Sequence, residues 1–487
     1  MKILYASSEA SPYIKSGGLG DVAYALPKQL TKIKGNEICV FLPYYKSIKE
    51  NPAFGIEYIT DFSVPLGWRN QYAGLFKSVV KSTGVGKNKR NDLVFYFIDN
   101  EYYFGRDGIY GYPDDGERFA FFCKAVLESL SHIDFMPDII HANDWQMGYI
   151  PLLLDAFYRN LDGYGDIRTV FTIHNIEYQG KADLDFGEKV LGVDRSYNGC
   201  IEFDSLSNAM KCAIVLSDKV TTVSKTYSYE IRYPYYSHGL DGVLSENAYK
   251  LCGIVNGIDT KLYDPSSDPV IPANYRPSDI SGKALCKKQL QKRLSLRAEA
   301  DIPVVAMISR LVAHKGFELL EYIGEEMINS CGIQLVIIGT GDSRFENYIR
   351  YLAGKYPDKV SANIVFDPVL ANMTYAGADF FLMPSKSEPC GLSQLIAMRY
   401  GTIPIVRETG GLFDTVTPVD INTMKGRGLT FKLYNAHDML DAVKRATELY
   451  RDRAKRDTVI SNIMRYDCSW KKPAGEYMKI YSEIVHQ

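Results

Sequence analysis

The sequence predicts an α/β protein with parallel sheets, divided into two domains. Short apolar runs alternate with stretches of helical periodicity in both halves of the chain, and this alternation is typical of parallel sheets with right-handed crossovers. A chain of 487 residues is also too long for one hydrophobic core. A Gly-Gly-Leu turn between an apolar run and a helical stretch occurs near each end, as expected if the two halves have related architectures.

In the first half, five apolar runs are predicted strands, with two helical stretches between them. The strands are residues 3–5, 38–42, 139–141, 170–174 and 220–223, and the helices are residues 22–33 and 118–130. Between about residues 55 and 98 the pattern changes to short alternating runs separated by turns. This change predicts a β-rich insertion.

The second half repeats the α/β pattern, with predicted strands at residues 304–308, 335–338, 364–366, 380–383 and 403–406. The turn signal Asn256-Gly257 follows the last apolar run of the first half. We therefore place the domains at residues 1–254 and 255–469. Residues 470–487 form one more amphipathic segment after the second domain is complete, and we expect this helix to pack back on the first domain.

Composition excludes several classes of function. The net charge of −2 shows no basic footprint for nucleic acid or an anionic membrane. No apolar run approaches the length of a membrane span, and the apolar stretch at the N-terminus is too short for a signal peptide. The nine cysteines are scattered without a Cys-x-x-Cys pair, which favours a reducing cytoplasm, and the seven histidines are dispersed, which argues against a metal site.

The two glycine motifs are Lys15-Ser16-Gly17-Gly18-Leu19 and Thr409-Gly410-Gly411-Leu412. Paired glycines at a helix start let a ligand approach the backbone closely, and the N–H groups there suit a phosphate. Together the motifs predict a cleft between two domains that holds a phosphorylated substrate from both sides. Either motif alone is equally well explained as a glycine turn for helix–strand packing.

Two other motifs would predict different enzymes, and we reject both. Gly18-Leu19-Gly20-Asp21-Val22-Ala23 matches the dinucleotide fingerprint, but the loop before it is long and the second strand ends without an acidic residue for a ribose. We therefore expect no nicotinamide cofactor. Asp183-Leu184-Asp185 has the Asp-x-Asp pattern of metal-dependent nucleotide-sugar enzymes, but it lies in a polar loop away from any strand end.

Arg310 and Lys315 follow the first strand of the second half. Ligands of open α/β sheets bind at the carboxyl ends of strands. An arginine fork and a lysine ammonium there could hold a diphosphate. The alternative is a solvated basic loop.

Glu388 follows another strand of the second half, just before a helix predicted to start at Gly391. Its carboxylate could contact sugar hydroxyls or a developing positive charge, and the alternative is a helix-capping carboxylate. Cys390 could be a nucleophile, but no histidine is close in sequence, so we favour a packed thiol.

His174 ends a predicted strand of the first half, and Asp144-Trp145 follows another. A histidine at the carboxyl end of a parallel strand is a candidate functional group, although a buried histidine is more often structural. Trp145 offers a face on which a sugar could stack.

These segments resemble, in order and spacing, the bacterial glycogen synthase and plant starch synthase family. The resemblance extends nearly from end to end. Its most specific motifs are Lys15-Ser16-Gly17-Gly18-Leu19, Ser309-Arg310-Leu311 with Lys315-Gly316, Glu388-Pro389-Cys390-Gly391-Leu392, and Thr409-Gly410-Gly411-Leu412. Ser16 stands where the family usually has threonine, and it keeps the hydroxyl.

The resemblance implies a GT-B fold, in which two Rossmann-like domains face each other across a deep cleft. The first domain would lie on the acceptor side and the second would bind the nucleotide sugar. The implied activity is that of a metal-independent, retaining glucosyltransferase of glycogen or starch biosynthesis. It would transfer glucose from ADP-glucose to the non-reducing end of an α-1,4-glucan, without a cofactor.

The resemblance also implies a role for each site residue. Lys15 would contact the diphosphate and the transferred glucose, Arg310 and Lys315 would stabilise the leaving ADP, and His174, Asn256 and Glu388 would bind the glucosyl unit. The implied catalytic residues are Lys15, His174, Arg310, Lys315 and Glu388. The implied nucleotide-sugar ligands are Lys15, Gly18, Asn256, Arg310, Lys315, Phe366, Cys390, Gly391, Leu392, Ser393 and Thr409, and the implied acceptor-side residues are Glu9, Asp144 and Trp145.

Phe366 stands where bacterial members often have a tyrosine that stacks on adenine, and phenylalanine keeps the stacking face. Retention could proceed through Glu388 as a nucleophile or on the front face without a covalent intermediate. Related transferases of the sucrose or trehalose synthase type, and an inactive glucan-binding protein, are the alternatives. The cations Lys15, Arg310 and Lys315 argue against a pure binding protein, which has no leaving phosphate to stabilise.

Overall fold

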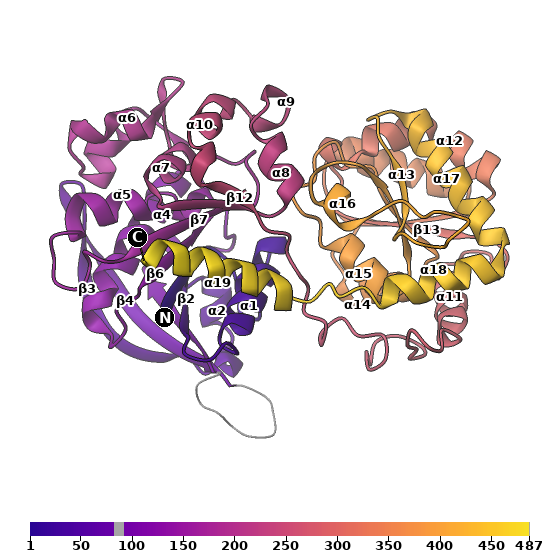
Figure 1. Cartoon of the computed structure of the whole chain (residues 1–487), viewed down its shortest axis with the longest axis horizontal. Coiled ribbons are helices and arrows are strands. Elements are labelled where there is room, and N and C mark those ends of the chain that lie inside the picture. The colour runs from indigo at the N-terminus through magenta and orange to yellow at the C-terminus, as the bar shows by residue number, and fades with distance from the viewer. Residues whose placement is uncertain (82–91, 487) are drawn as a thin grey trace. The chain divides into compact units, whose positions relative to one another are not determined.

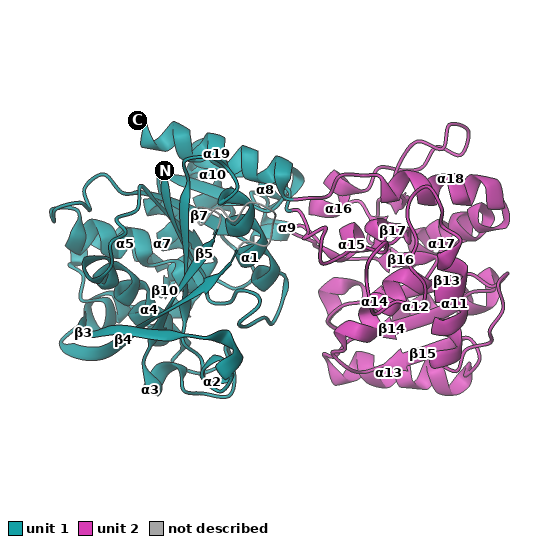
Figure 2. Ribbon diagram, turned by 90° about the horizontal axis from the view of Figure 1, so that it is seen from below, with its two compact units in different colours: residues 1–256, 470–487 teal, residues 257–469 magenta. Residues whose placement is uncertain are grey.

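The computed structural model describes residues 1–81 and 92–486. The chain forms two compact units, unit 1 being Met1–Asn256 with Trp470–Gln487 and unit 2 being Gly257–Ser469 (Figure 2). The division after Asn256 lies two residues beyond the one we placed from the sequence. Each unit has a hydrophobic core of its own. Among the described residues, no helix is both long enough and apolar enough to cross a membrane.

Unit 1 contains a nine-stranded sheet with the strand order β12-β11-β7-β6-β1-β2-β5-β4-β3. The strands from β12 to β5 pair in parallel, and β4 and β3 extend the sheet antiparallel, so the predicted β-rich insertion is confirmed. The strands are β1 Lys2–Ala6, β2 Glu37–Pro43, β3 Glu57–Leu66, β4 Arg69–Val80, β5 Leu93–Asp99, β6 Ile139–Asn143, β7 Arg168–Ile173, β11 Lys219–Thr222 and β12 Leu251–Gly253. A small second sheet consists of β8 Lys181–Ala182, β9 Glu202–Phe203 and β10 Leu206–Asn208.

The helices of unit 1 include the two that the sequence predicts, with shifted ends. The first begins at Gly18 instead of residue 22, so the glycine motif forms its first turn. The helices are α1 Gly18–Leu30, α2 Lys46–Lys49, α3 Glu101–Phe104, α4 Asp115–Ser129, α5 Ile150–Leu153, α6 Asn198–Ile201, α7 Ala209–Leu216, α8 Lys225–Glu230, α9 Pro234–Ser237, α10 Asp241–Glu246 and α19 Lys471–Val485.

Helix α19 packs on unit 1, although it follows unit 2 in the sequence (Figure 1). Its buried side chains lie on one apolar helix face, and they are Pro473, Ala474, Tyr477, Ile480, Tyr481 and Ile484. The Tyr481 hydroxyl lies 2.7 Å from Nδ1 of the buried His141 in β6. The last helix is therefore part of the unit 1 core.

Unit 2 has a six-stranded, all-parallel sheet with the strand order β15-β14-β13-β16-β17-β18. The strands are β13 Val304–Ile308, β14 Gln334–Ile338, β15 Val360–Asn363, β16 Phe380–Met383, β17 Ile403–Arg407 and β18 Leu429–Phe431. The helices are α11 Gly282–Arg293, α12 Phe317–Cys331, α13 Ser343–Lys355, α14 Pro368–Gly377, α15 Ser393–Arg399, α16 Gly410–Thr415, α17 Ala436–Arg451 and α18 Arg453–Met464.

Two local predictions for unit 2 are wrong, and one short strand was missed. The third strand is β15, not residues 364–366, because the edge strand is half polar whereas the apolar residues that we assigned to it follow in an exposed loop. Helix α15 begins at Ser393 and not at Gly391, whose φ of +72° is left-handed. The short strand β18 was not predicted.

Candidate functional site

In unit 1, four of the predicted site residues follow the carboxyl ends of different parallel strands. Glu9 follows β1, Asp144 follows β6, His174 follows β7, and Asn256 lies three residues beyond β12. Because these strands run in parallel, their carboxyl ends meet at one edge of the sheet. Asn256 is buried, and among the described residues its Oδ1 has no hydrogen-bond partner.

Glu9 is buried and binds the first glycine motif. Its Oε2 accepts hydrogen bonds from the backbone N–H groups of Ser16 at 2.5 Å and Gly17 at 3.2 Å, and the Ser16 hydroxyl donates at 3.1 Å. Burial raises the pKa of Glu9, and these hydrogen bonds oppose that rise. Two amides that we expected to face a phosphate therefore bind a carboxylate of the same unit.

Lys15 extends from this turn, and its Nζ lies 2.6 Å from Asp21 Oδ2. Its side chain is 34% exposed. A Cβ added at Gly20 would lie 3.1 Å from Lys15 Cβ and 3.3 Å from Glu9 Oε2. The motif thus packs Lys15 closely beside the Glu9 carboxyl group, and the role of Lys15 and Gly18 toward a diphosphate stays a prediction.

Tyr110 reaches Glu9 from a different part of unit 1. Its hydroxyl donates to Glu9 Oε1 at 3.3 Å and lies 2.7 Å from Ser8 Oγ. Burial raises the pKa of Tyr110 well above its usual value, so the hydroxyl stays protonated. Sequence reasoning missed this residue, because Tyr110 lies in a loop about a hundred positions from Glu9 and no local pattern marks it.

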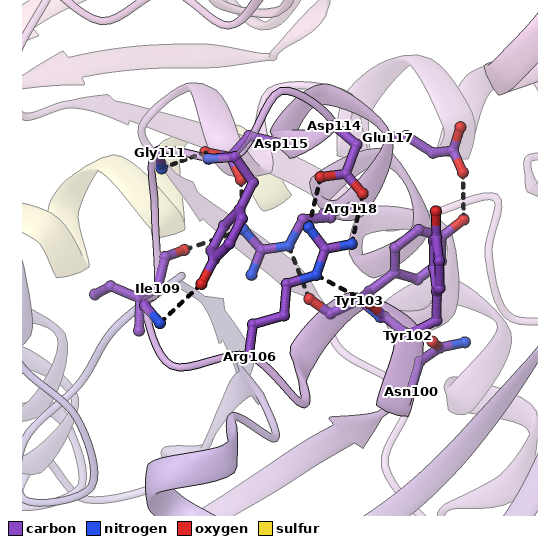
Figure 3. Close-up of polar contacts among 12 residues, drawn as sticks. Asn100, Tyr102, Tyr103, Arg106, Ile109, Gly111, Asp114, Asp115, Glu117 and Arg118 are labelled. Atoms are coloured by element: carbon purple, nitrogen blue, oxygen red, sulfur yellow. Dashed lines mark hydrogen bonds and ion pairs between the residues drawn. The ribbon is translucent and has the colours of Figure 1, made fainter.

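Two arginines hold the loop that carries Tyr110 (Figure 3). Arg106 binds both carboxylate oxygens of Asp114 at 2.6 Å. Arg118 of α4 is fully buried, donates to the carbonyl oxygen of Tyr103 at 2.8 Å and forms an ion pair with Asp115. Charge-assisted bonds of this kind fix a loop more firmly than neutral ones.

Asp144 and His174 lie side by side at this edge. Asp144 Oδ1 accepts the backbone N–H groups of His174 at 2.7 Å and Asn175 at 3.3 Å. His174 Nε2 lies 2.9 Å from Oδ1 of Asn143. Burial lowers the pKa of His174 to about 3, so the imidazole is neutral near neutral pH.

Burial raises the pKa of Asp144 to about 7, against the two backbone hydrogen bonds, with a further rise from the charge of Glu9. The folded protein therefore holds a proton on Asp144 between about pH 4 and pH 7, where an unfolded chain has lost it. The free energy of unfolding should fall as pH rises through this window.

The variant Asp144→Asn cannot lose this proton. We compare its free energy of unfolding with that of the unmodified protein, both measured by urea titration. The difference should grow in favour of the variant between about pH 4 and pH 7 and stay constant above pH 7. Asp162→Asn, an exposed position of unit 1, is the control for removal of a carboxylate. A difference that does not change with pH would contradict the assignment.

Trp145 is partly packed. Its ring meets Phe119 edge-on at a centroid distance of 5.4 Å, and a Cβ on Gly180 would lie 2.3 Å from the indole. Gly180, with φ +65°, is thus required for close packing against this ring. The assignment of Trp145 to the acceptor stays a prediction.

In unit 2, Lys315 and Glu388 meet although they lie in different motifs. Lys315 Nζ is 2.7 Å from Glu388 Oε2, and the Ser385 hydroxyl donates to the same oxygen at 3.0 Å. The side chain of Glu388 is only 7% exposed. Among the described residues, no side-chain hydrogen bond caps the start of α15 at Leu392, so the helix-capping alternative for Glu388 is wrong.

Arg310 and Phe366 are exposed at the same edge of the unit 2 sheet. Arg310 follows β13, and Phe366 follows β15 with 73% of its surface exposed. Strands β13, β15 and β16 are parallel members of one sheet, so these residues and Glu388 follow strand ends that share an edge. A cation, an aromatic face and a paired carboxylate are therefore available there.

The second glycine motif packs against the loop of Glu388. Gly411 N–H donates to the Glu388 carbonyl oxygen at 3.0 Å, and a Cβ on Gly411 would lie 2.1 Å from the Cys390 carbonyl oxygen. Gly411 is thus required for close packing of the motif against this loop. Thr409 and Cys390 are buried, and Leu392 immediately precedes α15, which begins at Ser393. Binding roles for Thr409, Cys390, Gly391, Leu392 and Ser393 stay predictions.

The Asp183-Leu184-Asp185 motif lies in a loop, and Asp185 forms an ion pair with Lys189. Within residues 1–81 and 92–486, no group of three or more His, Cys, Asp or Glu side chains is arranged to hold a metal ion.

Two family models match the chain. The starch synthase catalytic domain matches residues 2–246, and the glycosyl transferases group 1 family matches residues 289–463. The glycogen synthase of Clostridium novyi is 46% identical over 100% of both chains, and that of Clostridium acetobutylicum is 47% identical over 100% of both.

Solved structures give the same result. The catalytic domain of starch synthase IV from Arabidopsis thaliana, bound to ADP and acarbose, is 32% identical with a TM-score of 0.90, covering 100% of this chain and 99% of that one. Sucrose-phosphate synthase from Thermosynechococcus elongatus, at 17% identity and a TM-score of 0.61, covering 100% of this chain and 99% of that one, shares the fold alone. The predicted GT-B class is thus confirmed, and the chain belongs to the family of the bacterial glycogen synthases and plant starch synthases.

Proposed function

We propose that this protein transfers glucose from ADP-glucose to the non-reducing end of an α-1,4-glucan, with retention and without a metal. The observation that carries the proposal is the ion pair of Lys315 and Glu388 at the carboxyl edge of the unit 2 sheet, 2.7 Å between Nζ and Oε2. One position thus offers a cation for a leaving diphosphate and a carboxylate for a sugar. The related starch synthase IV was solved with ADP and acarbose, which supports both assignments.

In this proposal, charged side chains stabilise the opposite charges that develop on the substrate during the reaction. Arg310 and Lys315 meet the negative charge of the departing diphosphate, and Glu388 faces the positive charge that grows on the glucosyl carbon. Glu388 Oε2 is bound by both Lys315 and Ser385. Because the ion pair with Lys315 lowers the nucleophilicity of this carboxylate, we favour an electrostatic role for Glu388 over a covalent one.

The proposal also assigns roles to residues of unit 1. The neutral His174 binds the glucosyl unit, and Glu9, Asp144 and Trp145 lie toward the glucan. We also propose a cytoplasmic location, in which the nine cysteines, none of which forms a disulfide, would remain reduced.

Donor choice tests the proposal. The protein should have a higher kcat/KM with ADP-glucose than with UDP-glucose, measured as labelled glucose incorporated into glycogen. The exposed ring of Phe366 is available to stack on a purine. Because base stacking on an aromatic side chain contributes about 1–3 kcal/mol, Phe366→Ala should raise KM for ADP-glucose roughly tenfold or more.

Tyr322→Ala is the matched control, since Tyr322 is an equally exposed ring on α12 of the same unit, 76% exposed. Equal or better kcat/KM with UDP-glucose would defeat the donor assignment. An unchanged KM in Phe366→Ala would remove Phe366 from the donor site.

A further inference from the structure

Asn143, the last residue of β6, is fully buried beside His174 and forms hydrogen bonds with both ends of its amide. Its Nδ2 donates to the carbonyl oxygens of Ala6 at 3.0 Å and His141 at 3.2 Å. Its Oδ1 lies 2.8 Å from the Tyr5 hydroxyl and 2.9 Å from His174 Nε2. No role was predicted for this residue from the sequence.

These partners determine which way the Asn143 amide points. A carbonyl oxygen can only accept a hydrogen bond, so the atom that faces Ala6 and His141 must be the NH2 group. A flipped amide would place an oxygen against two carbonyl oxygens. Oδ1 therefore faces Tyr5 and His174, and it can only accept from them.

The orientation of Asn143 in turn determines where the proton of His174 lies. Because Oδ1 accepts, Nε2 of His174 must carry a hydrogen. The ring is neutral near neutral pH, since burial lowers its pKa to about 3, and it therefore has one ring proton. Nδ1 is then the unprotonated nitrogen, and no hydrogen bond to it occurs among the described residues.

The position of the ring is fixed as well. The backbone N–H of His174 donates to Asp144 Oδ1 at 2.7 Å, and the ring nitrogen is held by Asn143. Asn143 is itself held by Tyr5 from β1. Three strands thus determine the direction in which Nδ1 offers its lone pair.

We propose that Asn143 is a positioning residue that holds His174 as its Nε2–H tautomer, so that Nδ1 accepts a hydrogen bond from a hydroxyl group of the glucosyl unit. The part of this inference that concerns the sugar rests on the proposed function, whereas the tautomer does not. A sugar hydroxyl can donate to Nδ1, but a group that only accepts hydrogen bonds cannot replace it. The histidine thus selects for a hydroxyl at that position of the donor.

The tautomer can be measured on the complete protein by 15N NMR with labelled histidine, since protonated and unprotonated ring nitrogens have well-separated shifts. The His174 signals are identified by their loss in His174→Gln. At pH 7 we expect a protonated Nε2 and an unprotonated Nδ1. A protonated Nδ1 would overturn the proposal without any further variant.

Two variants test the role of Asn143. Asn143→Leu removes the acceptor but keeps the number and branching of side-chain heavy atoms. The tautomers of His174 should then mix and the ring should lose the contact that orients it. Because both the tautomer and the direction of Nδ1 are then lost, kcat should fall roughly tenfold, as for loss of one hydrogen bond to the sugar. Tyr5→Phe removes the other hydrogen-bond donor to Asn143 Oδ1 but leaves Asn143 in place. His174 should therefore keep its Nε2–H tautomer in this variant. Asn36→Leu is the control, because Asn36 is also a buried amide of unit 1, with Nδ2 donating to the Leu30 carbonyl oxygen at 3.3 Å.

The outcomes separate this inference from the proposed function. An unchanged tautomer in Asn143→Leu would overturn the positioning role. A mixed tautomer with unchanged kcat would overturn the hydrogen bond between Nδ1 and the sugar. If the unmodified protein shows the expected tautomer but does not use ADP-glucose, the proposed donor is wrong and the positioning of His174 by Asn143 stands.

Discussion

Replacing Arg310 by alanine is expected to lower kcat by about 10²–10³-fold while leaving the fold intact, because removing a group that meets the charge developing in the transition state costs about 3–4 kcal/mol. Arg310 is exposed at the end of β13, so its removal leaves no cavity in the core. The measurement is kcat with saturating ADP-glucose and glycogen, with the melting temperature as the test of folding.

Lys315 requires a milder substitution, because its loss would leave the buried carboxylate of Glu388 without its cation. Lys315→Gln removes the charge but keeps an N–H donor for Glu388, and it should lower kcat by a similar factor. Lys292→Ala, at an exposed position near the end of α11, is the control for loss of a positive charge from unit 2.

The same experiment tests metal independence. With the two cations in place, EDTA should have little effect on kcat. Strong inhibition by EDTA that manganese reverses, or near-normal kcat in Arg310→Ala, would show that these side chains do not stabilise the leaving diphosphate.

The second large effect is expected for Lys15→Gln, which should lower kcat by about 10²-fold but weaken ADP binding much less. Lys15 belongs to unit 1, whereas Arg310 and Lys315 belong to unit 2. ADP can therefore still be held by the unit 2 cations when Lys15 is absent. Lys15→Gln should therefore destabilise the transition state, in which the phosphate charge is larger, more than it destabilises bound ADP.

The measurements are kcat and the Kd of ADP on the same purified variant. Lys34→Gln, an exposed lysine of unit 1, is the control for charge removal. The ion pair of Lys15 with Asp21 is partly exposed and should contribute little to stability, so a folding defect is not expected. Near-normal kcat would show that Lys15 is a surface residue of its turn and has no part in catalysis.

Hydrophobic patterning predicted most of the strands because parallel strands are apolar on both faces and leave a continuous run in the sequence. It failed at β15, an edge strand in which Ser361 and Asn363 interrupt the run, while the exposed Val365 and Phe366 after it resemble a strand. Edge strands are less buried, so their hydrophobic signal is weaker.

The sequence by itself determined where chemical groups lie along the chain. A strand end followed by a charged or polar residue identified Arg310, Glu388 and His174, because ligand sites of parallel sheets form where strands end. Motif spacing identified the family. These are local properties, and they need no knowledge of which distant segments meet.

Only the tertiary structure decided what each of these groups contacts. In the folded protein Glu388 forms an ion pair with Lys315. Glu9 accepts hydrogen bonds from the backbone amides of Ser16 and Gly17, and Asn143 forms a hydrogen bond with His174. Hydrogen bonds depend on distances of about 3 Å and on direction, whereas residues far apart in sequence carry no local mark of such contacts. The partners of the site residues, and hence their charge and tautomer, follow from the folding of the whole unit.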